Sequence, residues 1–111
     1  MFVKLQEKYG KFGFNVVGLN DERGPSEEAN VKKIKDFSAD YSMNYPCALI
    51  TEEILSQLPD FKGFPTTLFI DHHGAVRLTA FGFHEYGYLD TVTRALLTER
   101  QLEKDRGTAT N

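Results

Sequence analysis

The chain has 111 residues, enough for one small domain with a single hydrophobic core and too few for two. Its 41% hydrophobic and 26% charged residues are typical of a globular protein, and a net charge of -3 gives no reason to expect a nucleic acid or an anionic membrane as partner. No apolar run approaches the roughly 20 residues that cross a bilayer, so we expect no membrane segment in this chain.

The first residues have the pattern of an amphipathic helix. Phe2, Leu5 and Tyr9 recur at helical spacing, and Gly10 follows as a C-cap. The apolar face is already present at the first turn without an N-cap, so we expect either the natural start of the protein or a helix that begins upstream. Residues 14–19 are strong β-formers and predict a strand.

A second helix is predicted after Ser26, which is a good N-cap. An apolar stripe at three- and four-residue spacing should pack this helix on a sheet; it consists of Val31, Ile34, Phe37 and Tyr41. An extended segment over 45–50 and a short helix over 51–58 follow, and Pro59 should stop that helix.

The clearest pattern in the chain is a β-hairpin. Thr66 to Ile70 is an apolar and β-branched run of the kind found in a covered strand, and Asp71 and Gly74 suit positions i and i+3 of a type I turn. Residues 75–81 read as the returning strand. Pro65 stands just before the hairpin, where a missing N–H costs least and where the X-Pro bond is either trans or cis.

The last element is an amphipathic helix after a loop over 82–85. Its buried face is expected to contain Leu89, Val92, Leu96 and Leu97. From about Glu99 the sequence turns polar, and its last residues should fray.

We therefore expect a single domain over 1–98 and a polar C-terminal tail over 99–111. The order of elements predicts an α/β fold with helices on both faces of the sheet.

This order resembles the TlpA/ResA branch of thioredoxin-like thiol-disulfide oxidoreductases, together with Phe14 to Asn20, Tyr45-Pro46, the run from Gly63 to Asp71 and His73-Gly74. The resemblance covers residues 2 to about 97. It implies a thioredoxin-like fold with a mixed sheet, and reduction or exchange of disulfides in partner proteins. It also implies that Phe64, Pro65 and Thr66 contact a substrate chain, that Pro65 follows a cis bond, and that the protein works outside the cytoplasm, tethered to a membrane.

The chain departs from this family at its redox centre. The sequence contains one cysteine, Cys47, and no Cys-x-x-Cys pair, so we expect no disulfide within the chain and no catalysis by these residues alone. Apolar neighbours and the absence of a nearby cation favour a buried structural thiol. The family's central strand, which carries the redox pair into the first helix, also has no match. Without it, the strands at 14–19 and 66–70 each have an unpaired edge.

Two functional hypotheses follow from this departure. In the first, the chain is an amino-terminally truncated piece of a thiol-disulfide oxidoreductase, or it closes the gap by direct pairing or by dimerising through its strand edges. In the second, it is a non-catalytic thioredoxin-like module that binds an extended protein segment along the strand after Pro65.

Two further groups of polar residues have a simpler interpretation. His72 and His73 fall in the hairpin turn, where adjacent side chains should point in different directions and no third ligand is near in sequence. We expect a solvated turn with no metal, and no cofactor elsewhere. His84 and Glu85 precede the last helix, where a capping role is expected.

Overall fold

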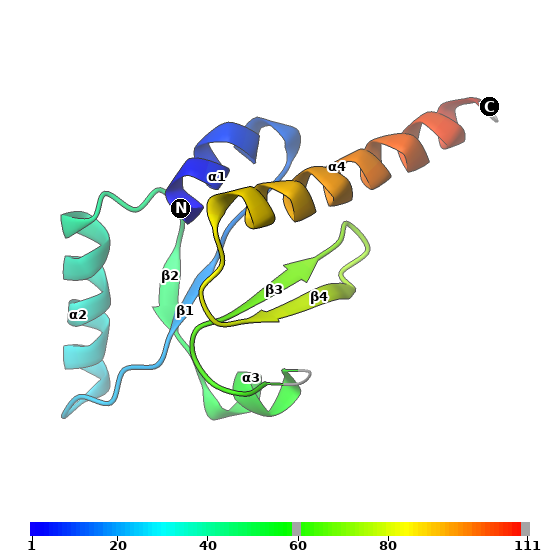
Figure 1. Ribbon diagram of the computed structural model, residues 1–111. Coiled ribbons are helices and arrows are strands. Elements are labelled where there is room, and N and C mark those ends of the chain that lie inside the picture. Colours follow the sequence, from blue (N-terminus) through cyan, green and yellow to red (C-terminus); the bar gives the residue numbers. More distant parts are fainter. Residues whose placement is uncertain (59–60, 110–111) are drawn as a thin grey trace. The chain divides into compact units, whose positions relative to one another are not determined.

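The computed structural model describes residues 1–58 and 61–109 and divides into two compact units, Met1–Gln57 and Leu58–Asn111. Each unit contains both helices and strands, and both parallel and antiparallel pairs occur, so the expected mixed α/β class is confirmed (Figure 1). The single domain over 1–98 stays a prediction. Pro59, expected to stop a helix, lies outside the described residues.

The first unit alternates helices with two short strands. In chain order its elements are α1 (Phe2–Tyr9), a 3-10 turn η1 (Gly10–Phe12), β1 (Gly18–Asn20), α2 (Glu27–Asp40), β2 (Cys47–Leu49) and α3 (Glu52–Gln57). β1 and β2 pair in parallel, with Gly18 opposite Cys47 and Asn20 opposite Leu49. The expected elements are therefore all present, although their lengths differ from the prediction.

β1 is shorter than the strand predicted over 14–19. The Gln6 side chain of α1 donates a hydrogen bond of 3.0 Å to the carbonyl of Phe14 and accepts one of 2.7 Å from the amide of Val16. These backbone groups are thus satisfied by a side chain rather than by a neighbouring strand. The chain enters regular pairing only at Gly18, whose amide donates to the Pro46 carbonyl.

α2 begins as predicted, but most of its apolar stripe is not covered. The Ser26 hydroxyl accepts a hydrogen bond of 3.1 Å from the amide of Ala29, which confirms the N-cap. Of the stripe only Ile34 is buried, whereas Phe37 and Tyr41 are 45% and 66% exposed. α2 packs against β2, as predicted. Most of the stripe stays exposed because two strands of three residues form too narrow a sheet to cover a helix of 14 residues.

The second unit contains the predicted hairpin and the last helix: β3 (Thr66–Ile70), β4 (Val76–Phe81) and α4 (Tyr86–Ala109). β3 matches the predicted strand residue for residue, and it pairs antiparallel with β4. Inside the unit, Phe69, Ala80, Leu89 and Thr93 are buried. The polar segment from Glu99, expected to be a tail, continues α4 as helix through Ala109, since it is rich in helix-forming residues and contains pairs such as Gln101 with Asp105.

The hairpin turn is built by Asp71. Its carbonyl accepts a hydrogen bond from the amide of Gly74, as the predicted turn from i to i+3 requires. Gly74 itself has a left-handed φ of 83°, which glycine adopts without a steric cost. The Asp71 carboxylate accepts from the amides of His73 and Ala75 at 2.9 and 3.0 Å and from the Arg77 guanidinium at 3.3 Å. The bond from Ala75, followed by those from His73 and Arg77, holds the pKa of Asp71 below its usual value.

No helix among the described residues combines the length and the apolar character that crossing a membrane requires.

The lowered pKa of Asp71 predicts that the hairpin loses stability in acid. Because the folded-state pKa lies below the unfolded value of about 3.9, the carboxylate stabilises the fold above that value and loses this effect as pH falls through the folded pKa. In Asp71→Asn this part of the acid-dependent loss should disappear. Urea unfolding measured across the acid range checks it, with Asp40→Asn, at the exposed end of α2, as the control. Parallel pH profiles for wild type and Asp71→Asn would contradict the assignment.

Candidate functional site

The three predicted substrate-contact residues form one continuous segment at the head of β3. The Phe64–Pro65 peptide bond is cis. The Phe64 side chain is 47% exposed, and its ring stands edge-on to that of Phe61 at 5.2 Å. The Thr66 hydroxyl donates a hydrogen bond to the carbonyl of Gly63, so the first residue of β3 is bonded to the segment that precedes it. An exposed aromatic side chain therefore precedes β3 by two residues.

Beyond this segment, the backbone of β3 is paired on one edge only. The Pro65 carbonyl accepts from the amide of Gly82 at one end of the hairpin, and the amide of Asp71 donates to Ala75 at the other. Since residues in an antiparallel pair alternate between the two edges, the odd-numbered residues of β3 face β4. The amide and carbonyl groups of Thr66 and Leu68 consequently point to the other edge, where β3 has no strand partner among residues 1–58 and 61–109.

The first unit repeats this arrangement on β1. Gly18 donates to Pro46 and Asn20 accepts from Ile50, so these two residues face β2. The backbone groups of Leu19 between them point away from β2, and within the described part of the chain no further strand pairs with β1. Each sheet has two strands, so every strand of the described residues has one unpaired edge; those of β1 and β3 are the two edges expected to be open in the absence of a central strand.

An open edge of this kind offers a defined chemistry. Its amide and carbonyl groups can pair with an extended polypeptide, and the side chains that flank the edge then select which segment binds. The ring of Phe64, two residues before β3 in the chain, is exposed and can receive an apolar side chain of an incoming segment. Such an edge can pair with the backbone of a peptide, which a small metabolite does not offer.

Cys47 is half-buried on β2 rather than fully buried as predicted. Its Sγ lies 3.9 Å from the carbonyl of Tyr45, and burial, with a smaller contribution from the neighbouring thiol, raises the pKa of the Tyr45 phenol. The sequence provides no second cysteine for exchange. The position therefore has the properties of a packed thiol and not of a redox centre.

The structure joins the two turn histidines to a residue that the sequence analysis missed. His72 Nε2 lies 2.9 Å from Oε2 of Glu103, and His73 Nε2 lies 3.0 Å from its Oε1. The hydrogen bonds to His73 and then His72 lower the pKa of Glu103, while partial burial opposes this effect. The only sequence signal was the spacing of Glu99 and Glu103, four residues apart on one face of α4. His84 lies apart from this group; its Nε2 is 3.1 Å from the carbonyl of Phe81.

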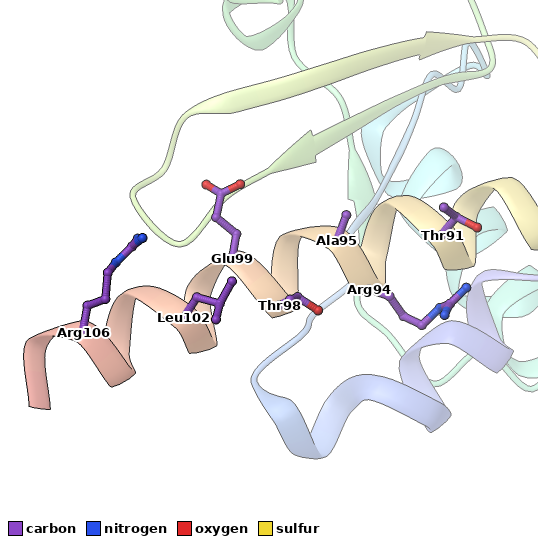
Figure 2. A pocket seen from close by; sticks show the side chains of 7 residues that line it. All are labelled: Thr91, Arg94, Ala95, Thr98, Glu99, Leu102 and Arg106. Atoms are coloured by element: carbon purple, nitrogen blue, oxygen red, sulfur yellow. The ribbon is translucent and has the colours of Figure 1, made fainter. Parts of the chain in front are cut away.

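A shallow hollow on α4 has the form of a helix surface rather than of a ligand site (Figure 2). All the residues that line it belong to this one helix: Thr91, Arg94, Ala95, Thr98, Glu99, Leu102 and Arg106. Glu99 is engaged by Arg77, and Arg94 by Asp90. A hollow lined by a single helix lacks the convergent walls that bury a small ligand.

Comparison with known proteins supports the fold. The chain matches no protein-family model, and no curated protein is similar to it in sequence. Among solved structures it is similar to "a Putative Thioredoxin from Neisseria meningitidis", with a TM-score of 0.70 and 17% sequence identity. The match covers 86% of this chain and 60% of the Neisseria chain, so this chain spans less than two thirds of that protein. The 111 residues therefore have a thioredoxin-like fold.

Proposed function

We propose that this chain is the substrate-binding part of a TlpA/ResA-type thiol-disulfide oxidoreductase domain, which acts on disulfides in partner proteins. The observation that carries the proposal is the open edge of β3, headed by Phe64 and Pro65 in a thioredoxin-like fold. A substrate segment pairs with the outward backbone groups of Thr66 and Leu68 and rests a side chain on the Phe64 ring.

The redox step needs groups that these residues do not contain. Disulfide exchange requires a thiolate of lowered pKa and a second cysteine that resolves the mixed disulfide. Cys47 is the single cysteine, so the redox pair comes from polypeptide outside the 111 residues. In this proposal a strand from the same source pairs with the open edge of β3. A second copy of this chain is the other source of such a strand, and it would bring no redox pair.

The alternative function is a non-catalytic binding module, and the single cysteine favours it. In that case the open edge of β3 holds an extended segment of a partner protein as its final function, and no exchange follows. The two functions share the binding site and differ in whether a cysteine pair accompanies it.

Intact mass and thiol counting of the protein purified from its source organism separate these functions. For the oxidoreductase we expect a mass above 12.6 kDa and two further cysteines that alkylate only after reduction. A mass of 12.6 kDa with alkylation at Cys47 alone would exclude the redox function and leave the binding module. The 111-residue chain by itself should show no disulfide reductase activity in either case.

A pair of phenylalanine variants tests the binding site itself. Phe64 and Phe37 are 47% and 45% exposed, and each lies beside a second aromatic ring, so they form a matched pair on different units. With a permanently unfolded, carboxymethylated protein as probe, Phe64→Ala should weaken binding by about tenfold, since an aromatic contact of about 1.4 kcal/mol is lost. Phe37→Ala should bind like wild type.

Backbone amide NMR locates the same contact. Adding the probe should shift the amide signals of Thr66 and Leu68 more than those of Thr67 and Phe69, which face β4. Equal binding by the two variants, or probe-induced shifts confined to the first unit, would contradict a site on β3.

A further inference from the structure

The contact between the hairpin turn and α4 brings together three side chains of the types that bind transition metals. The donor atoms of His72, His73 and Glu103 all lie within 4.8 Å of one another. Both Nε2 atoms are directed at the same carboxylate, and the two imidazole rings lie side by side with centroids 4.0 Å apart. We call these three residues the His-His-Glu cluster.

The surrounding residues hold both halves of the cluster in place. Asp71 fixes the turn through the amides of His73 and Ala75. Arg77 then bridges Asp71 to Glu99, which links the turn to the helix one turn before Glu103. The ligand-bearing segments are therefore positioned by contacts that do not use the three ligand groups themselves. Such preorganisation lowers the entropic cost of closing a metal site.

The convergence of the two histidines corrects the expectation drawn from sequence. Adjacent side chains point to opposite faces in a strand, but His72 and His73 lie in a turn, where this alternation does not hold. The missing third ligand is Glu103, 31 residues after His72 in sequence. Both reasons for expecting no metal at this turn are thus removed by the structure.

The geometry fits a small divalent ion. Zinc binds histidine nitrogen and carboxylate oxygen at about 2.0–2.2 Å in a tetrahedral arrangement, so neighbouring donor atoms lie about 3.4 Å apart. The nitrogen-to-oxygen distances of 2.9 and 3.0 Å are shorter and are those of hydrogen bonds, so the side chains have to rotate to admit an ion. Two histidines and one carboxylate leave a fourth position for water.

Exposure also suits an ion that arrives from solution. The side chains of His73 and Glu103 are 59% and 45% exposed, whereas that of His72 is 21% exposed. One ligand is therefore held by its surroundings while the others remain accessible. Hydrogen bonding alone also accounts for the contacts, with both Nε2 atoms donating to the carboxylate, and the experiment below separates the two explanations.

We propose that His72 Nε2, His73 Nε2 and the Glu103 carboxylate bind one borderline divalent transition metal ion, for which Zn²⁺ has the matching ligand preference. The bound ion links the β3–β4 turn to α4, two segments separated by about 30 residues. This site uses different residues from the proposed substrate edge of β3, so a failure to bind metal would not contradict the proposed function.

Calorimetric titration of the untagged chain with Zn²⁺ alone tests the site, at a pH above the ordinary imidazole pKa of about 6.5 so that the nitrogens are free to bind. We expect one ion per chain. His72→Ala, His73→Ala and Glu103→Gln should each weaken binding by about tenfold or more, since a lost ligand costs at least as much as a lost supporting contact.

His84→Ala is the matched control, because it removes the one other histidine of the chain and leaves the cluster intact. Cys47→Ser excludes binding at the single thiol, and both controls should bind Zn²⁺ like wild type. Circular dichroism of each variant confirms that it is folded.

Side-chain nitrogen NMR gives a readout that hydrogen bonding alone would not move. Zn²⁺ should shift the Nε2 signals of His72 and His73 and leave that of His84 unchanged. The proposal is overturned if no saturable binding occurs, if Glu103→Gln and the two cluster histidine variants bind like wild type, or if binding is lost in His84→Ala or Cys47→Ser.

Discussion

The proposed binding site depends on one constraint, which is that β3 has a strand partner on one side only. β3 is covered by side chains well enough to bury Phe69, yet the backbone of Thr66 and Leu68 is left facing an open edge. Backbone amides and carbonyls that remain unpaired are costly when buried and attract other extended chains when exposed. β1 of the first unit likewise has one edge without a strand partner among the described residues.

The hairpin turn is the second constraint, and it is held by ion pairs and by backbone hydrogen bonds together. The Asp71 carboxylate accepts hydrogen bonds from the backbone of the turn. The Arg77 guanidinium forms ion pairs with both Asp71 and Glu99 on α4. This chain of contacts holds the turn against the helix and so determines where His72 and His73 are presented. The open edge and the histidine cluster thus both belong to the β3–β4 hairpin.

Local chemistry explains which features could be predicted from the sequence. The limits of β3, the turn at Asp71 and Gly74 and the cap at Ser26 depend on residues within four positions of one another, and all three were predicted correctly. The late start of β1 pairing depends on Gln6, which is 8 residues from Phe14, and the third cluster member is about 30 residues from the histidines. The spacing of residues in the sequence does not predict such side-chain contacts, because they depend on the tertiary structure. The position of Pro65 and its neighbours came from family resemblance, because nothing in their local chemistry identifies a binding site.

Hydrogen exchange on the isolated chain tests the open edge most directly. With an open edge on β3, the amides of Thr67 and Phe69, which face β4, should be protected. Those of Thr66 and Leu68 should exchange rapidly and become protected when an extended segment binds. If all four amides are equally protected in the isolated chain, β3 already has a partner on both edges. The central claim, that this edge receives a strand from elsewhere, would then be wrong.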